Sequence, residues 1–422
     1  MAGLCPADAF RRTEVGRAGL VARARQVAGD EAEVVEPAVA VQAELADDEA
    51  GLVVRRLELH VELPEVHVVL LDPRERGERL GELPRSGLGS ARLPSPALRR
   101  LDYGVRGGID LGGTKIQAVV VDDEHRPLGD ARQPTPRDGG PEAVAAAMVD
   151  TLREAAVKAS VLPSSLESVG VGSPGAVDED AGTVAHARNL PDWDEPFPLS
   201  QFLSDAIGTS VAIGNDVQVA VEAEFELGAG RPYSSLFGVF WGTGVGGGLI
   251  LDGKAWLGRG MAGEFGHTVV RLGGARCPCG RRGCVEAYAG RGAMEARARR
   301  LLEHGHKTEL FDLMKKAGRD RLTSGVWEKA LDRGDRVAAH LIERAVAALA
   351  AGIASVINLL DLEAVVIGGG LGTRLGAPYA KQIEDAMTPH LFVPEQPPTV
   401  RVAELGDLGG AIGAALLSAR SR

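Results

Sequence analysis

The stretch Gly108-Ile109-Asp110-Leu111-Gly112-Gly113-Thr114-Lys115 is followed by an apolar run at residues 116–121. Apolar segments on both sides of Gly112-Gly113-Thr114 favour two strands, and the glycines let the chain reverse tightly between them. The stretch therefore predicts a strand–turn–strand hairpin. A second hairpin of the same kind is predicted at residues 236–251, around Gly242-Thr243-Gly244.

Helical and strand segments alternate between and beyond the two hairpins. An Ala-rich helix with proline at its start is expected at residues 141–159, and a long apolar helix at residues 337–360. Short strands are expected at 169–171, 211–213 and 364–367, and a small-residue helix is expected to open at residues 407–411. This alternation predicts an α/β fold in two halves, each opening on a glycine-rich hairpin, with negligible sequence identity between the halves.

The two glycine turns are candidate phosphate-binding loops. Glycine lets the backbone approach a phosphate and present N–H groups to it, and Thr114 adds a hydroxyl donor. Asp110 can hold the water shell of Mg²⁺. A plain tight hairpin is the alternative for one such turn, but a fold rarely needs two. The second turn runs into a strand rather than a helix, so its formal G-x-G-x-x-G spacing does not predict a dinucleotide fold.

Asn215 and Asp216 end a predicted strand in the first half. Ligand sites of α/β folds lie at strand ends. A carboxylate there can accept the proton of a hydroxyl that attacks a phosphoryl group. The alternative is a helix N-cap, which both residue types form well. One of the two can cap the helix while the other does the chemistry.

Cys277, Cys279 and Cys284 crowd into eight residues, with His267 ten residues upstream of the first. A Cys₃His set is a closed tetrahedral zinc site, so the spacing predicts bound Zn²⁺. A local disulfide among the three cysteines is the alternative. Glu264 lies just before His267 and Glu286 just after Cys284 in the same stretch, and their carboxylates can hold the hydroxyls of a sugar. Metal loop and acidic pocket are therefore expected to form one site.

Composition excludes several classes of protein. The net charge of -11 argues against a duplex nucleic-acid binder, which needs clustered Lys and Arg. No uncharged apolar run approaches the roughly 20 residues that span a bilayer. The N-terminus lacks a basic-then-apolar signal pattern, and cysteines bunched beside a histidine fit a reducing compartment. We expect a cytoplasmic protein with no nucleic-acid or membrane partner.

Residues 1–104 differ from the rest of the chain, because they contain no Lys, Asn, Ile or Trp. The alternation of Leu57, Leu59, Val61 and Leu63 resembles a strand, but Pro64 interrupts it. Residues 83–100 are rich in Gly, Pro, Ser and Arg, like a linker. We expect this extension to be mostly loose, with no catalytic domain of its own, and to reflect a start codon assigned too far upstream.

Five motifs occur in an order that resembles the ROK family of bacterial sugar kinases and sugar-responsive repressors. They are Asp110-Leu111-Gly112-Gly113-Thr114-Lys115, Gly214-Asn215-Asp216, the loop at 241–248, Ala262-Gly263-Glu264-Phe265-Gly266-His267 and the cysteine loop at 277–286. The resemblance covers residues 105–422. It implies an actin-like, hexokinase-type (ribonuclease H-like) fold with two lobes around a cleft. The small lobe would comprise residues 105–217 and 403–422, and the large lobe residues 218–402.

The resemblance also implies roles for single residues. Asp216 is similar in position to the catalytic base of the family, and His267 has two implied roles, as a sugar contact and as a zinc ligand. The implied sugar ligands are Asn189, Asn215, Asp216, Glu264, His267 and Glu286. The implied ATP and Mg²⁺ ligands are Asp110, Gly112, Gly113, Thr114, Lys115, Gly242, Thr243, Gly244, Gly368, Gly369 and Gly370. A homodimer is expected on the same ground.

The function expected from these observations is ATP-dependent phosphorylation of a hexose. The first candidate substrate is glucose, phosphorylated at its 6-hydroxyl. Mannose, fructose, allose or an N-acetylated amino sugar are the alternatives within this class. A sugar-sensing repressor is the alternative from another class. It would need a basic helix–turn–helix, whereas residues 1–104 carry 14 Arg against 18 Asp and Glu and show no such pattern. Arg281 and Arg282, beside the cysteine loop, are expected to be a solvated face.

Overall fold

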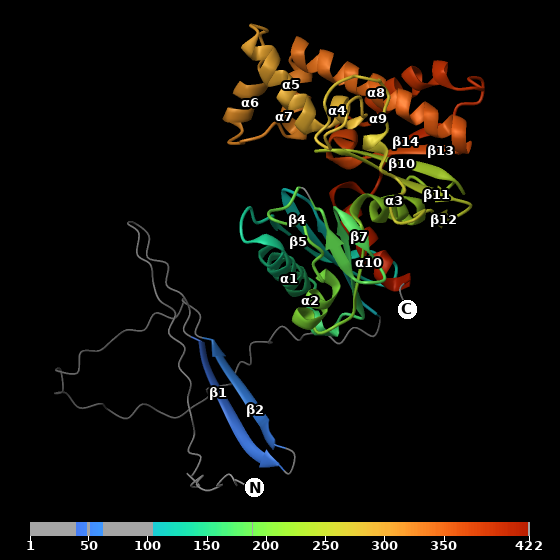
Figure 1. Ribbon diagram of the computed structural model, residues 1–422. Helices are drawn as coiled ribbons and strands as arrows, with labels where there is room; N and C mark the ends of the chain where they lie inside the picture. Colours follow the sequence, from blue (N-terminus) through green and yellow to red (C-terminus); the bar gives the residue numbers. More distant parts are fainter. Residues whose placement is uncertain (1–38, 49–50, 62–103, 188, 421–422) are drawn as a thin grey trace, which may run out of the picture. The chain divides into compact units, whose positions relative to one another are not determined.

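The computed structural model describes residues 39–48, 51–61, 104–187 and 189–420 (Figure 1). The chain divides into two compact units, Met1–Ala91 and Arg92–Arg422. In the first unit, β1 (Val39–Asp48) and β2 (Gly51–Val61) form an antiparallel pair. β2 agrees with the predicted strand up to Val61, and its partner strand was not predicted. Most of the predicted loose extension, including the linker at 83–100, lies outside the described residues.

The second unit contains two sheets, and its first sheet forms the first lobe. Its strands are β3 (Arg106–Leu111), β4 (Lys115–Val121), β5 (Pro127–Pro134), β6 (Ser168–Ser173) and β9 (Val211–Asn215). They lie in the order β5-β4-β3-β6-β9, with the first three antiparallel and the last two joined in parallel. The hairpin predicted around Gly112-Gly113-Thr114 is confirmed as β3–β4.

The second sheet repeats this topology in the second lobe. Its strands are β10 (Leu236–Trp241), β11 (Val245–Leu251), β12 (Lys254–Ala255), β13 (Ala364–Gly368) and β14 (Thr399–Val402). Their order, β12-β11-β10-β13-β14, again places an antiparallel hairpin group beside two parallel strands. Both halves thus follow the same path despite their negligible sequence identity, and the second predicted hairpin is confirmed as β10–β11.

Helices cover both faces of the first sheet. Ala118 and Val120 of β4 pack in one core with α1 (Gly140–Lys158) and α2 (Leu199–Ile207). Val119 and Val121, which point to the opposite face of the strand, pack against α10 (Gly409–Arg420). The helix predicted to open at 407–411 therefore begins at Gly409, after a short 3₁₀ turn at Gly406–Leu408. Small connecting elements are β7 (Ala176–Asp178), β8 (Thr183–Ala185) and a 3₁₀ turn at Pro163–Ser165.

Helix α10 can lie close to the first sheet because the strands present glycines beneath it. A Cβ added to Gly108 of β3 would lie 1.9 Å from the Ala411 carbonyl oxygen, and one added to Gly170 of β6 would lie 1.7 Å from that of Ala414. Any side chain at these positions would force the helix outward. The small residues of the C-terminal segment are therefore matched by small residues in the sheet.

The second lobe has a large helical layer on one face of its sheet (Figure 1). Its main helices are α8 (Arg336–Leu360) and α9 (Gly369–Met387), with α4 (Glu286–Ala289), α5 (Arg291–Glu303), α6 (Leu310–Lys316) and α7 (Ser324–Asp332) around them. Among the described residues, only α8 is long and apolar enough to cross a membrane, and most of its apolar stretch is buried inside this lobe. Short 3₁₀ turns lie at Phe265–His267 and Thr388–His390.

Helix α3 (Asp216–Leu227) joins the two lobes. It covers the other face of the second sheet, where Val221 packs in one buried cluster with strand residues Leu236, Ile250 and Val366. It also packs along α10, where a Cβ added to Gly413 would lie 2.3 Å from the Val219 carbonyl oxygen. The α3–α10 pair is therefore the packed joint between the lobes, and α3 begins at the residue predicted to be the catalytic base.

Candidate active site and metal site

Asn215 and Asp216 lie where β9 ends and α3 begins. The Asn215 side-chain oxygen accepts hydrogen bonds from the backbone N–H groups of Val217 and Gln218, both at 3.1 Å, so Asn215 is the N-cap of α3. The Asp216 carboxylate accepts a hydrogen bond from the Val217 N–H at 2.9 Å. The cap anticipated as an alternative is thus present, and it uses only the oxygen of the Asn215 amide.

The Asp216 carboxyl lies near two other acidic groups. Burial raises the pKa of Asp216 to about 7, and the charge of Asp110 and then that of Glu264 add to this, against the Val217 hydrogen bond. Burial also raises the pKa of Asp110, which Lys115 partly opposes. A carboxyl with this pKa can accept a proton near neutral pH. The Asp110–Asp216 pair also gives a cation such as Mg²⁺ oxygen ligands of the type it prefers.

The first glycine turn is closed by its own backbone. The Gly112 N–H donates to the Lys115 carbonyl oxygen at 3.0 Å, and the Thr135 hydroxyl donates to the Gly112 carbonyl oxygen at 2.6 Å. Asn189 lies directly over Gly113, where an added Cβ would approach the Asn189 Cβ to 2.9 Å. The predicted sugar-side residue Asn189 and the predicted phosphate turn are therefore in contact. The Lys115 amine donates to the Gln117 side chain.

The second glycine turn contacts a predicted sugar ligand. The Gly242 N–H donates to the Gly244 carbonyl oxygen at 3.0 Å, and the Val245 N–H donates to Glu286 Oε2 at 3.0 Å. A Cβ added to Gly244 would lie 2.4 Å from the same carboxylate oxygen. Glycine at 244 is therefore needed for Glu286 to reach the turn.

The third glycine run lies beside the second turn. Gly369, at the start of α9, has a φ of 77°, and an added Cβ would lie 2.7 Å from the Trp241 backbone nitrogen. The Gly370 nitrogen lies 4.0 Å from a Cβ added to Gly242. Residues 242–244 and 368–370 are thus brought together at the carboxyl ends of neighbouring strands, where nucleotide sites form.

His267 and the three cysteines of the loop form one cluster. Their ligand atoms all lie within 4.8 Å of one another, with His267 Nδ1 at 3.7 Å from Cys277 Sγ and Cys279 Sγ at 3.9 Å from Cys284 Sγ. Tetrahedral zinc with Zn–S bonds of about 2.3 Å would separate two sulfurs by about 3.8 Å. The donor set fits zinc. The disulfide alternative is wrong for these three cysteines, which are all free.

The pKa values of two thiols in the cluster are shifted in opposite directions. Burial raises the pKa of Cys277 to about 12. Cys279 is also desolvated, but hydrogen bonding with Arg281 outweighs this and lowers its pKa to about 6. Arg281 is exposed, as expected for a residue of a solvated face, and its side chain also favours the Cys279 thiolate, the form that binds metals.

The two ring nitrogens of His267 face different groups. Nδ1 faces the Cys277 sulfur, whereas Nε2 lies 3.8 Å from Glu264 Oε2. A metal bound at Nδ1 would fix the orientation of the ring and the tautomer of the imidazole. The other nitrogen would then face the acidic side of the site, where Glu264 lies. Cys277 Sγ is also 3.9 Å from Glu286 Oε1, so the cluster adjoins both glutamates.

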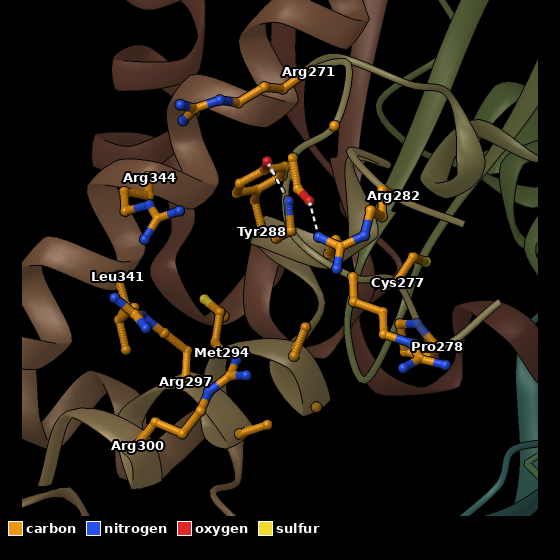
Figure 2. Close-up of a pocket in the computed structure, with 18 of the residues that line it drawn as sticks. Arg271, Cys277, Pro278, Arg282, Tyr288, Met294, Arg297, Arg300, Leu341 and Arg344 are labelled. Atoms are coloured by element: carbon orange, nitrogen blue, oxygen red, sulfur yellow. Dashed lines mark hydrogen bonds between the residues drawn. The ribbon is translucent and has the colours of Figure 1, made fainter. Parts of the chain in front are cut away.

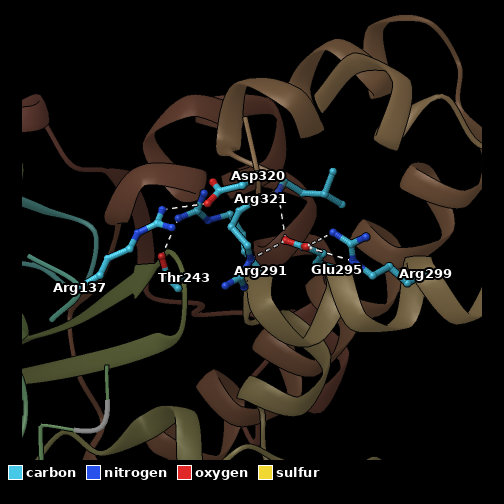
Figure 3. A network of polar contacts seen from close by, with 8 residues as sticks. Arg137, Thr243, Arg291, Glu295, Arg299, Asp320 and Arg321 are labelled. Carbon is cyan, nitrogen blue, oxygen red and sulfur yellow. Dashed lines mark hydrogen bonds and ion pairs between the residues drawn. The ribbon is translucent and has the colours of Figure 1, made fainter. Parts of the chain in front are cut away.

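Sequence reasoning missed a polar network behind the second glycine turn (Figure 3). Arg291 donates to the Thr243 hydroxyl at 2.6 Å, and its backbone N–H donates to the Gly242 carbonyl oxygen at 3.2 Å. The buried Glu295 carboxylate binds Arg299 at 2.7 Å and Arg321 at 3.1 Å. Arg291 lies 48 residues after Thr243, and no local pattern in the sequence indicates this contact.

Comparison with known proteins gives consistent results. The model of the ROK family matches residues 106–421. The glucokinase of Thermotoga maritima is 34% identical over 288 residues, 67% of this chain and 88% of its own. The N-acetyl-D-glucosamine kinase of Citrobacter koseri is 33% identical over 322 residues, 74% and 98% respectively. The crystal structure of a ROK family glucokinase from Streptomyces griseus with glucose and AMPPNP is 32% identical, with a TM-score of 0.66, covering 75% of this chain and all of that one.

Proposed function

The chain belongs to the ROK family, and from this premise we propose that it is an ATP-dependent hexose kinase acting on the 6-hydroxyl of glucose. The observation that carries the proposal is the Asp216 carboxyl at the start of α3, with a pKa of about 7 and with Asp110 and Glu264 nearby. The similarity to glucokinases, one of them in complex with glucose and AMPPNP, supports the choice of substrates.

In this proposal Asp216 accepts the proton of the sugar hydroxyl. The hydroxyl oxygen forms a bond to the γ-phosphorus, and the bond from that phosphorus to the bridging oxygen of ADP breaks. The remaining sugar hydroxyls are held by carboxylate, imidazole and amide groups. These are the side chains of Asn189, Asn215, Glu264, His267 and Glu286. Because Glu286 also accepts the Val245 N–H, a sugar bound there is fixed relative to the second glycine turn.

The glycine turns would bind the phosphates through their backbone N–H groups, with Thr114 and Thr243 as hydroxyl donors and Lys115 as a cation. Residues 368–370 would lie at the adenosine side. Asp110 would hold Mg²⁺, which neutralises charge on the transferred phosphoryl group when bound. Both Asp110 and Asp216 have raised pKa values in the ligand-free chain, and a cation between them would favour their ionised forms.

We also propose that His267, Cys277, Cys279 and Cys284 hold a structural zinc ion. The first support is that their ligand atoms all lie within 4.8 Å of one another. The second is that three cysteines and one histidine fill all four positions of a tetrahedral zinc ion, as is typical of structural zinc. The ion would tie residues 277–284 to the 3₁₀ turn that carries His267. Its role would be to orient His267 and the neighbouring Glu264 and Glu286 toward the sugar.

A coupled kinase assay with ATP and a panel of sugars tests the proposal. The panel contains glucose, mannose, fructose, allose and N-acetylglucosamine, and we expect the highest kcat/KM with glucose. Highest activity with N-acetylglucosamine would move the chain to the specificity of the Citrobacter koseri relative. No phosphorylation of any sugar, with intact zinc content, would refute kinase activity and favour the repressor alternative, which a gel-shift assay would then examine.

We propose that the protein is a cytoplasmic homodimer with no nucleic-acid or membrane partner. The net charge of -11 supports the absence of a nucleic-acid partner, and the free thiols at 277, 279 and 284 support a reducing compartment. The homodimer rests on the resemblance to the ROK family. Light scattering on the purified chain measures the oligomeric state. A monomer at micromolar concentration would contradict the proposal.

A further inference from the structure

A pocket lies in the second lobe, and its lining residues are drawn in Figure 2. It has a volume of about 930 Å³ and is bounded by α5, α8, Tyr288 of α4 and residues 271–282. None of Asp110, Asp216 or the glycine turns lines it, although it shares Cys277 with the metal cluster. The volume is in the range of pockets that bind small molecules.

The pocket is lined by arginines from three segments of the chain. On α5, Arg297 and Arg300 lie on the face that Ala293 and Ala296 also present to the pocket, and Arg344 comes from α8. The full set is Arg271, Arg276, Arg282, Arg297, Arg300 and Arg344. No Asp or Glu is among the lining residues, all of which belong to the described part of the chain.

Four arginines elsewhere on the same lobe have a glutamate partner that the pocket arginines lack. Arg299, Arg321, Arg333 and Arg374 each form an ion pair with a glutamate. Within the described residues, no ion pair involves any of the six arginines of the pocket. Arg282 instead donates to a neutral group, the Gly274 carbonyl oxygen, at 3.2 Å. Arg344 lies over the Tyr288 ring at 5.5 Å.

Such a cluster is unusual in a chain with a net charge of -11. Five of the six arginines are exposed and Arg344 is half-buried. Like charges that line one pocket repel one another, and carboxylates would normally be interspersed among them. An anion in the pocket would remove this repulsion. Guanidinium groups present forked N–H donors that match phosphate oxygens in pairs, which makes phosphate the best-fitting class of anion.

We propose that this arginine pocket is a binding site for a small, multiply charged phosphate compound, separate from the proposed nucleotide site. The occupant is small because the negative net charge of the chain opposes long-range attraction of a nucleic acid. Apolar groups of Met294, Leu341 and Tyr288 also line the pocket and would accept the organic part of a phosphate ester. Condensed inorganic phosphate and sugar phosphates share the required chemistry.

Calorimetric titration of the zinc-loaded full-length chain with inorganic triphosphate tests the proposal. The same titration with glucose 6-phosphate distinguishes the inorganic from the organic source. The first variant is Arg297→Ala combined with Arg300→Ala. The second is Arg271→Ala combined with Arg276→Ala, which keeps the test usable if one pair impairs folding. The control is Arg319→Ala combined with Arg336→Ala, which removes the same charge at two exposed arginines outside the pocket.

The expected result is a binding event in the wild type that weakens at least tenfold in both pocket variants and persists in the control. Kinase turnover with glucose is measured in the same proteins, so failure of this proposal is distinguishable from failure of the proposed kinase function. Unchanged affinity and stoichiometry for both phosphates in the pocket variants would overturn the proposal, as would an equal loss in the control.

Discussion

Replacement of Asp216 by Asn is expected to abolish turnover and to stabilise the ligand-free protein at alkaline pH. The folded pKa of about 7 lies above the ordinary value of 3.8, so the folded chain keeps this proton over a range in which the unfolded chain has lost it. The stability of the wild type therefore falls as the pH rises from about 4 to 7. Above pH 7 the whole penalty of burying the ionised carboxylate is present.

The size of this penalty follows from the difference between the two pKa values. One pH unit corresponds to about 1.4 kcal/mol, so the ceiling is about 4 kcal/mol. The Asp216 side chain is only partly buried, so solvent screening reduces the expected value to about 2 kcal/mol. For a unit of this size, the gain corresponds to a rise in Tm of about 4 °C.

Thermal unfolding of zinc-loaded protein without magnesium or nucleotide, at several values between pH 6 and 8.5, measures the effect. Asp312→Asn, at an exposed position of α6, is the control for loss of one negative charge. The stabilisation in Asp216→Asn should grow with pH and shrink when magnesium is added. A variant less stable than the wild type at pH 8, or a difference independent of pH, would refute the electrostatic reasoning. Near wild-type kcat would refute the assignment of the base.

Three further predictions concern the metal, the second turn and the lobe packing. Metal analysis is expected to find one zinc per chain. Cys279→Ser should lose the zinc and raise the KM for glucose at least tenfold, whereas Cys5→Ser should do neither. Full activity without zinc would contradict the structural role of the metal. Arg291→Lys should lose the hydrogen bond to Thr243, which is worth about 2 kcal/mol, and should lower kcat/KM for ATP about thirtyfold. An unchanged kcat/KM for ATP would count against a positioning role of Arg291. Gly108→Ala should destabilise the fold by about 3 kcal/mol in denaturant, because its Cβ would meet the Ala411 carbonyl oxygen, whereas Gly325→Ala in α7, with no neighbour nearer than 4.0 Å, should not.

The parts of the fold that the sequence predicts are those with local signals. The hairpins at β3–β4 and β10–β11 are predictable because glycine turns separate runs of β-branched and aromatic residues. The helix at Gly140–Lys158 is predictable from its proline and alanines. The capping role of Asn215 was one of two uses considered for the Asn215-Asp216 pair, since cap and ligand chemistry require the same residue types.

The features that the sequence does not predict depend on contacts between distant segments. Arg291 reaches Thr243, and Arg344 joins Arg297 and Arg282 in one pocket, only because α4, α5 and α8 pack together. Arg282 is exposed, as expected for a residue of a solvated face, and it also lines that pocket. Charge patterns along the chain cannot show which arginines lack a carboxylate partner, because pairing is decided by tertiary packing.

The α3–α10 pair has a consequence for motion. Helix α3 covers the second sheet and α10 covers the first, and the two are held together by close backbone approach at Gly413. Asp216 opens α3, while Gly410 near the start of α10 lies against the Asp110 carboxyl. Rotation of one lobe against the other about this pair would displace distant loops far more than these two acids. The proposed proton acceptor and the proposed cation ligand would therefore move little in such a rotation, because both lie close to its axis.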